Sequence, residues 1–140
     1  MKSLPLIFFL VFVPSFGFAQ DSELEAVTKT VHLYFDGMIE RNGEKLEKAF
    51  LSEARLIGYR GDRLFVTPFE EWVSATKKGS PRDPSLFKNN LLSIRIVGNT
   101  ALAETELYWP GIYYYDFLTL IKIDGGWKIV HKTWHEKPLK

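Results

Sequence analysis

Three short turn signals divide the C-terminal half of the chain, and they constrain its fold more than any other feature. The turns are Gly98-Asn99, Pro110-Gly111 and Asp124-Gly125-Gly126. Around them lie four stretches rich in apolar, β-branched and aromatic residues, namely 91–97, 100–109, 112–123 and 127–136. Because turns this short join antiparallel neighbours, the pattern predicts a meander of four antiparallel strands.

The N-terminal half has the periodicity of helices instead. From Ser22 onward apolar residues recur at three- and four-residue steps, and Ser22 and Glu25 have the spacing of a capping box. Asn42-Gly43 is expected to end this first helix. We predict a second helix over 44–50, a strand over 55–60 with its return over 64–66, and a third helix capped by Thr67. Helices first and strands later indicate an α+β domain.

The first residues of the chain have the layout of a secretory signal peptide. Lys2 supplies a positive charge, residues 4–13 are almost wholly apolar, and the small residues Gly17 and Ala19 precede a cleavage site. So short an apolar stretch does not comfortably cross a hydrocarbon core of about 30 Å, which disfavours a membrane anchor. We therefore expect residues 1–19 to be removed and residues 20–140 to be exported to the periplasm or the medium.

Charge and composition exclude several classes of partner and chemistry. Loss of Lys2 with the leader would bring the 18 basic residues level with the 17 acidic ones. This balance gives no electrostatic footprint for a nucleic acid and no cationic run for an anionic membrane. The chain has no cysteine, which excludes disulfides, a thiol nucleophile and a lipid-bearing cysteine. It also has no nucleotide fingerprint, and we expect no cofactor.

The last two strands carry apolar residues on both faces. Phe117 and Ile121 point to one face, and Leu118 and Leu120 point to the other. A half-buried antiparallel strand should alternate, so both faces are expected to be covered. One face would pack on the helices and enclose a pocket. The other would meet a second copy of the chain, which predicts a homodimer.

Several motifs occur in a recognisable order along the chain. They are Tyr34-Phe35-Asp36-Gly37, Leu46, Phe50-Leu51, Ala54-Arg55-Leu56, Gly98-Asn99-Thr100-Ala101, Tyr115-Asp116-Phe117-Leu118-Thr119-Leu120, Asp124-Gly125-Gly126-Trp127-Lys128-Ile129-Val130 and Lys132. In this order they resemble the nuclear transport factor 2-like superfamily, and within it the group labelled "putative lumazine-binding". The resemblance implies a cone-shaped fold in which three N-terminal helices pack on a bent mixed or antiparallel sheet. Proteins of this fold include isomerases, dehydratases, small-molecule binders and interaction domains, so the fold alone implies no single reaction.

The final hairpin holds the candidates for acid–base chemistry. A two-residue turn places Asp116 opposite Thr133 or His135, on the face that carries His131 and His135. We expect this register because the turn is rich in glycine. An aspartate beside a histidine could orient the imidazole and raise its pKa, as acid–base catalysis requires. The alternative is a polar pair with a structural role.

A three-residue loop in the same hairpin would change the register. Asp116 would then face Lys132 and Trp134. A metal site is not expected in either case. His131 and His135 would lie about 13 Å apart along one strand, too far to share a zinc ion, and His32 belongs to the first helix.

Aromatic residues with polar tips are the candidates for ligand binding. The resemblance places Tyr34, Tyr59, Trp72 and Tyr113 where the first helix, the short strand, the third helix and the sheet converge. Such side chains can line a pocket and stack on a flat ligand, although most aromatic residues of such a chain belong to the core. With Asp116 and His135 at the pocket mouth, they form the predicted ligand-binding set.

These observations favour an exported protein that binds a small organic molecule. Two alternatives stay open. The first is a non-catalytic domain that dimerises through its sheet, which a large exposed apolar face would favour. The second is an isomerase or dehydratase in which Asp116 acts with His131 or His135, which a bell-shaped pH profile would favour.

Overall fold

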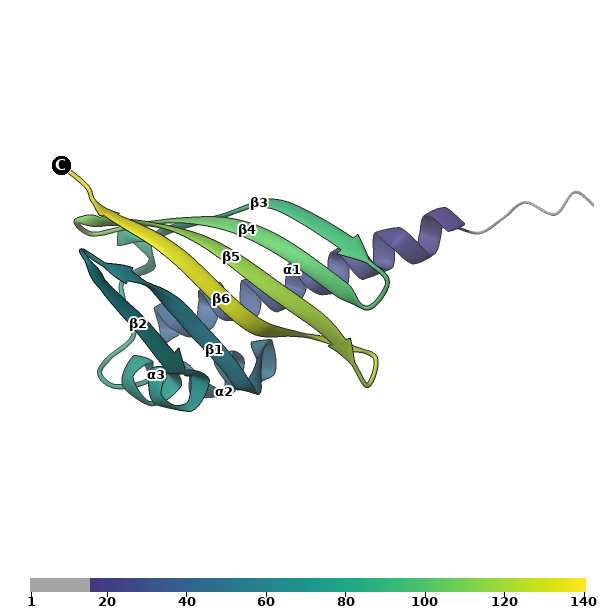
Figure 1. The fold of residues 1–140 in the computed structure, drawn as a ribbon, viewed down its shortest axis with the longest axis horizontal. Helices are drawn as coiled ribbons and strands as arrows, with labels where there is room; N and C mark the ends of the chain where they lie inside the picture. Colours follow the sequence, from purple (N-terminus) through teal and green to yellow (C-terminus); the bar gives the residue numbers. More distant parts are fainter. Residues whose placement is uncertain (1–15) are drawn as a thin grey trace, which may run out of the picture.

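A long helix lies along the concave side of a curved sheet (Figure 1). The computed structural model describes residues 16–140, with side chains from Gln20 onward. Its helices are α1 (Phe16–Glu40), α2 (Gly43–Ala49), α3 (Phe69–Thr76) and the short 3-10 turn η1 (Pro84–Leu86). Its strands are β1 (Phe50–Arg60), β2 (Arg63–Pro68), β3 (Lys88–Val97), β4 (Thr100–Trp109), β5 (Ile112–Ile123) and β6 (Gly126–Pro138).

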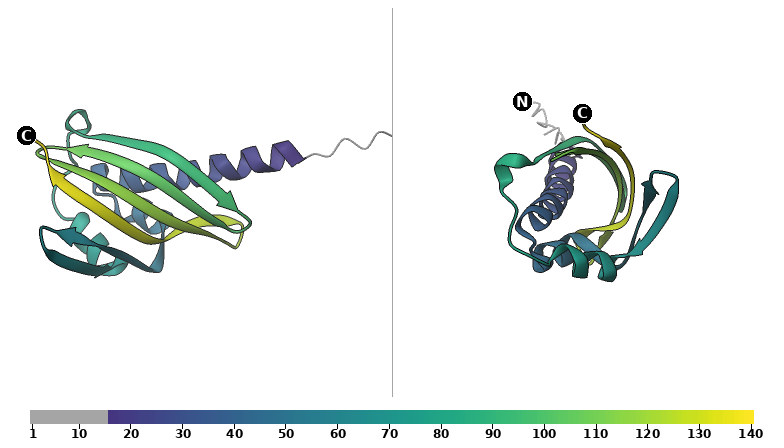
Figure 2. Two further views of the ribbon diagram at one scale, coloured as in Figure 1. Left: turned by 45° about the horizontal axis from the view of Figure 1, so that its top comes forward. Right: turned by 90° about the vertical axis from the view of Figure 1, so that its left-hand side faces the viewer.

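The six strands form one mixed sheet in the order β2-β1-β6-β5-β4-β3. All neighbours are antiparallel except β1 and β6, which pair in parallel. The predicted meander of four antiparallel strands is therefore confirmed as β3 to β6. Register shifts in β1, β3 and the β5–β6 pair bend these strands, and the sheet curls around α1 (Figure 2).

The predicted α+β architecture with three helices is confirmed, but two predicted helix caps are wrong. Ser22 lies inside α1, because the helix already runs through it from Phe16. Thr67 belongs to β2, and Pro68 holds the cap position of α3 without a side-chain bond. Asn42 does cap a helix, since its side chain accepts a hydrogen bond from the backbone N–H of Lys45 at the start of α2.

The predicted signal peptide falls almost entirely outside the described residues. Only its last part, residues 16–19, belongs to the described backbone, where it forms the start of α1. No helix within residues 16–140 combines the length and apolar character needed to cross a membrane.

The core lies between α1 and the concave face of the sheet. The helix buries one stripe of residues at three- and four-residue spacing: Val27, Val31, Tyr34, Phe35 and Met38. The sheet opposes it with Ala103, Leu107, Leu118, Leu120 and Ile129. Each fully buried leucine, isoleucine or valine contributes about 1.5–3 kcal/mol of transfer free energy, so this stripe fixes where α1 sits on the sheet.

Polar bonds hold the N-terminal part of α1 against the β5–β6 turn. The Glu23 carboxylate accepts hydrogen bonds from Lys122 Nζ at 2.6 Å and from Trp127 Nε1 at 2.8 Å. Two turns further on, the Thr30 hydroxyl lies 3.3 Å from the carbonyl oxygen of Trp127. The bond from Lys122, and then that from Trp127, lowers the pKa of Glu23 below its ordinary value.

Replacing Glu23 with glutamine should destabilise the protein in a pH-dependent way. A carboxyl group whose pKa is lower in the folded state stabilises the fold above its unfolded pKa and loses this effect as the pH falls through its folded pKa. The urea midpoint of Glu23→Gln should therefore lie below that of the parent at neutral pH, and the two should converge below pH 4.5, the ordinary value. The exposed Glu25→Gln serves as control, and a gap that does not change with pH would contradict the prediction.

Candidate functional site

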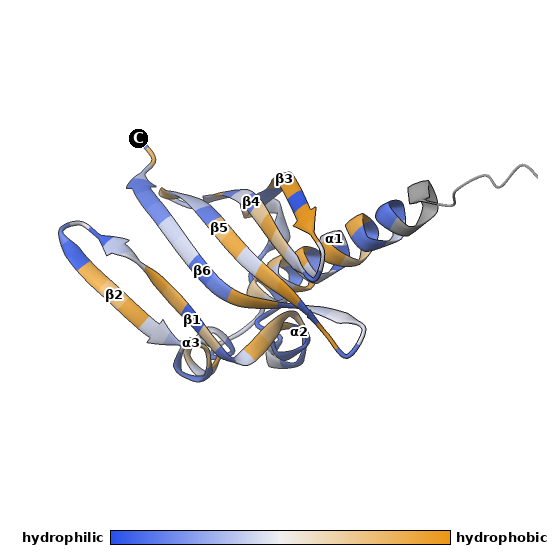
Figure 3. Ribbon diagram, turned by 45° about the vertical axis from the view of Figure 1, so that its right-hand side comes forward, coloured by the Kyte–Doolittle hydropathy of each residue, from blue (hydrophilic) through white to orange (hydrophobic). Residues whose placement is uncertain are grey.

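A cavity of about 520 Å³ opens between the concave face of the sheet and the helices. This volume is within the range of roughly 300–1,000 Å³ typical of small-molecule sites. Its wall is formed by Tyr34, Met38, Arg41, Leu56, Arg60, Phe65, Thr67, Glu71, Trp72, Ala75, Thr76, Arg82, Leu107, Trp109, Tyr114, Lys132 and Trp134. The part of β6 that borders the cavity is hydrophilic, whereas the part packed on the helices is hydrophobic (Figure 3).

A β-bulge in β6 decides which side chains face this cavity. The β5–β6 turn has two residues, because Ile123 pairs with Gly126. The pairing then continues to Leu120 with Ile129, but Thr119 pairs with His131, so Val130 is the extra residue. Beyond Val130 the register is shifted by one residue, and side chains that would have pointed outward now point inward.

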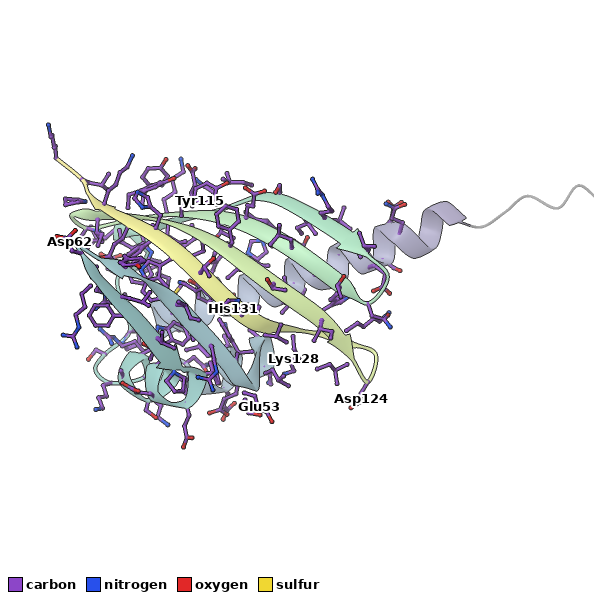
Figure 4. The ribbon with its side chains drawn as sticks, viewed as in Figure 1. Glu53, Asp62, Tyr115, Asp124, Lys128 and His131 are labelled. Carbon is purple, nitrogen blue, oxygen red and sulfur yellow. The ribbon has the colours of Figure 1, made fainter. Side chains whose placement is uncertain are left out.

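The bulge overturns the predicted pairing of Asp116 with a histidine. The predicted two-residue turn is present, yet Asp116 lies opposite Trp134 rather than Thr133 or His135. His131 and His135 pair with Thr119 and Tyr115 on the outer, convex face of the sheet. Figure 4 shows His131 and Tyr115 on the side of the sheet away from α1. The predicted Asp/His set does not form, because the two residue types lie on opposite faces.

Asp116 instead bonds with Tyr34 and Lys132 at the floor of the cavity. The Tyr34 hydroxyl donates to Asp116 Oδ2 at 2.7 Å, and Lys132 Nζ lies 2.8 Å from the same oxygen. Lys132 Nζ also donates to the Tyr34 hydroxyl oxygen at 2.5 Å. The Asp116 side chain is fully buried and that of Lys132 is 10% exposed. These three side chains, which come from α1, β5 and β6, form a closed polar triad.

The environment of the triad keeps Tyr34 protonated. Burial raises the pKa of Tyr34 well above its ordinary value, and the neighbouring Asp116 raises it further. The phenol is therefore a hydrogen-bond donor to Asp116 at neutral pH. A second oxygen of the carboxylate, Asp116 Oδ1, is buried without a partner among the described residues, as is the hydroxyl of Thr105 on the adjacent strand. Unpaired buried polar atoms are costly and tend to occur at functional sites.

Only part of the predicted ligand-binding set lines the cavity. Tyr34 and Trp72 do so, and Asp116 lies directly behind Tyr34 and Lys132. Tyr59 is 57% exposed and does not belong to the cavity wall. Tyr113 shares the outer face with His135, where its hydroxyl donates to Glu106 at 2.7 Å. The predicted convergence of Tyr59, Tyr113 and His135 on the pocket is wrong.

The predicted ligand-binding set did not include Trp134 or the glycine that accommodates it. Trp134 pairs with Gly58 across the parallel β1–β6 contact. A Cβ atom on Gly58 would lie 2.3 Å from the Trp134 indole, so only glycine leaves room for the ring. A glycine inside a predicted strand is a known sign of such a close approach, and this signal was available in the sequence.

The described residues contain no group of three or more His, Asp or Glu side chains placed to hold a metal ion. Cations are the more abundant charged groups of the cavity wall, where Arg41, Arg60, Arg82 and Lys132 face a single acid, Glu71. The site can therefore offer aromatic surface, positive charge and the remaining N–H donor of Lys132 to a ligand.

Comparison with known proteins places the chain in one family. The sequence model of the family described as "Putative lumazine-binding" matches residues 22–135. The chain is 27% identical over 122 residues to "Aldolase FrzH" of a Cladobotryum species. The aligned region covers 84% of this chain and 94% of that protein.

Solved structures share the fold. An NTF2-like protein of unknown function from Shewanella baltica is 25% identical, with a TM-score of 0.77 and coverage of 85% of this chain and 97% of that one. An NTF2-like protein of unknown function from Silicibacter pomeroyi is 22% identical, with the same TM-score and coverage of 84% and 98%.

Adding a methyl group at Gly58 should disturb the cavity wall. Gly58→Ala is expected to cost about 1–3 kcal/mol in the free energy of unfolding, because the new Cβ overlaps the indole of Trp134. Urea unfolding measures this cost, and tryptophan emission reports the displaced ring. In a Trp134→Leu background the same substitution should cost much less. An equal cost in both backgrounds would show that Trp134 is not the group that requires glycine.

Proposed function

This chain belongs to the "putative lumazine-binding" family of the nuclear transport factor 2-like fold, and on that premise we propose that it binds one small, flat organic molecule in its cavity. The observation that carries the proposal is the aromatic lining. Tyr34 and Trp72 come from the helices, and Trp109, Tyr114 and Trp134 come from the sheet. Rings on both sides of a cavity can hold a planar ligand by stacking and edge contacts.

The aromatic residues are held in place by contacts with one another. Trp72 lies 5.5 Å from Phe50 and 6.2 Å from Tyr34, measured between ring centroids. Trp109 makes an edge contact with Tyr114 at 5.8 Å and donates a hydrogen bond from Nε1 to Asn89 at 2.9 Å. Such fixed rings lose little conformational freedom when a ligand binds, which favours affinity.

We also propose that the protein is exported and acts as a homodimer. Export rests on the signal-peptide pattern of residues 1–19, with cleavage after Ala19. The dimer rests on the outer face of β4 and β5, where Leu102, Tyr108 and Phe117 are exposed, Phe117 by 44%. Large apolar side chains exposed on one sheet face favour association with a second copy.

Native mass spectrometry of protein purified from its own host tests these proposals together. We expect the mass of a chain that starts at Gln20, a dimer, and an additional small molecule that is lost on denaturation.

Two variants separate ligand binding from dimerisation. Trp72→Ala should abolish the retained molecule without changing the oligomeric state, since Trp72 lies in the cavity wall. Phe117→Lys should give monomers that keep the ligand. An empty cavity in every preparation, together with no binding of flat aromatic probes, would reject the binding function.

A second candidate function, proton-transfer catalysis next to a carbonyl group, is favoured by the Tyr34–Asp116–Lys132 triad. The Lys132 ammonium group lies in the cavity wall and could donate its remaining N–H to a developing enolate oxygen, while Glu71, the acid of the cavity wall, would accept the α-proton. Asp116 and the Tyr34 hydroxyl oxygen would hold the ammonium group in position from behind. The name of the Cladobotryum relative, an aldolase, agrees with chemistry of this kind.

The triad can be separated into its contributions to stability and to chemistry. Asp116→Asn should cost about 3–5 kcal/mol in the free energy of unfolding, because it leaves the Lys132 cation buried without a counter-charge. The apolar pair Asp116→Leu with Lys132→Met should recover most of that loss.

A separate experiment tests the catalytic candidate. If the site promotes enolisation, the parent protein should accelerate deuterium exchange at the carbon next to the carbonyl of cyclohexanone in D₂O, measured by NMR, and the apolar pair should not. Equal exchange rates would reject the catalytic candidate.

A further inference from the structure

We propose that the ligand of this cavity is an anion, a flat molecule with a carboxylate group that is bound by Arg41 and Arg82. This inference rests on the proposed binding function and narrows it to a chemical class. Arg41 follows the C-terminal end of α1, and Arg82 lies in the segment between α3 and η1. Both side chains belong to the cavity wall.

The charges of the cavity wall are not balanced. Lys132 is paired with Asp116 at 2.8 Å, and Arg60 lies 3.6 Å from Glu136. Within residues 16–140 neither Arg41 nor Arg82 forms an ion pair with a carboxylate. The acid of the wall, Glu71, pairs with neither of them, so these two guanidinium groups are the positive charges of the cavity wall that no ion pair compensates.

Two helix ends explain why these arginines lie where they do. Arg82 donates from a guanidinium nitrogen to the carbonyl oxygen of Met38, and its backbone N–H donates to that of Ile39 at 2.8 Å, both near the end of α1. Arg41 donates to the carbonyl oxygen of Thr76, the last residue of α3, at 3.0 Å. A helix C-terminus carries only about half a negative charge, so it compensates only part of the positive charge of each arginine. Each also retains N–H donors beyond those used in these bonds.

The two positively charged guanidinium groups repel each other. Burial lowers the pKa of Arg82, and the nearby positive charge of Arg41 lowers it further. An anion placed between them would relieve this repulsion. The planar fork of a guanidinium group can donate two parallel hydrogen bonds to a carboxylate or to a phosphate, and of these two the carboxylate is itself planar and fits a flat ligand.

The surroundings of Arg82 link the anion site to the aromatic lining. The Arg82 guanidinium carbon lies 5.0 Å from the centroid of the Trp109 ring, which fixes its plane by a cation–π contact. Trp109 in turn makes an edge contact with Tyr114. A ligand whose carboxylate meets Arg82 can therefore place its flat body against the rings of the cavity.

A matched pair of probes tests the inference. 2-Naphthoate and 2-naphthamide have the same flat body and differ in charge, and calorimetry gives the dissociation constant of each. We expect naphthoate to bind the full mature protein more tightly than naphthamide by roughly tenfold or more, the effect of charge-assisted hydrogen bonds. Arg41→Gln and Arg82→Gln should each weaken the binding of naphthoate more than that of naphthamide, so that the preference for the anion falls.

Control experiments distinguish the anion inference from the proposed binding function on which it rests. Arg95→Gln removes a cation of β3 outside the cavity wall and should change neither affinity. Added NaCl should weaken the binding of naphthoate but not that of naphthamide. Arg82→Lys should keep part of the preference for naphthoate over naphthamide. Both measurements remain informative if a glutamine variant fails to fold. Equal binding of the two probes would overturn the anion inference and leave the binding function standing. Binding of neither probe would overturn the anion inference, and together with an empty cavity in protein from its own host it would overturn the binding function as well.

Discussion

The extra residue in β6 is the constraint on which the cavity depends. Before it, Trp127 and Ile129 point into the core; after it, Lys132 and Trp134 point into the cavity. An unbroken strand would have turned the histidines inward instead and left the buried carboxylate of Asp116 without its lysine. The bulge also bends β6, which helps the sheet wrap around α1. One inserted residue thus sets both the chemistry of the site and the curvature of its wall.

Tyr34 joins the core of the protein to its site. Its ring belongs to the apolar stripe of α1 and packs on Phe35 and Phe50, while its hydroxyl completes the triad with Asp116 and Lys132. The position of the donors therefore depends on how α1 packs, and the same packing that stabilises the fold orients the site. Helix packing positions Arg41 and Arg82 in the same way, because hydrogen bonds to the ends of α3 and α1 hold them in place.

Local patterns were enough to predict the architecture but not the arrangement of the site. Glycine-rich turns and helical periodicity are short-range signals, and they gave the helices, the meander and the length of the β5–β6 turn correctly. The bulge has no such signal, since Val130 is an ordinary strand residue, and one shifted residue reversed the predicted partners of Asp116. The parallel contact between β1 and β6 joins residues far apart in sequence, so Gly58 could signal a close approach but not that Trp134 makes it.

The parallel pairing of β1 with β6 has a consequence for the order of folding. β6 is the last strand of the chain, yet it lies between β1 and β5, with Phe50 opposite Ile129. The N-terminal elements can form locally as they are made, but they cannot join the sheet until the C-terminal strand is present. Closing so long a loop is slow relative to forming hairpins. The cavity is therefore one of the last features to be assembled, and a chain shortened at its C-terminus would lose the strand that unites both halves.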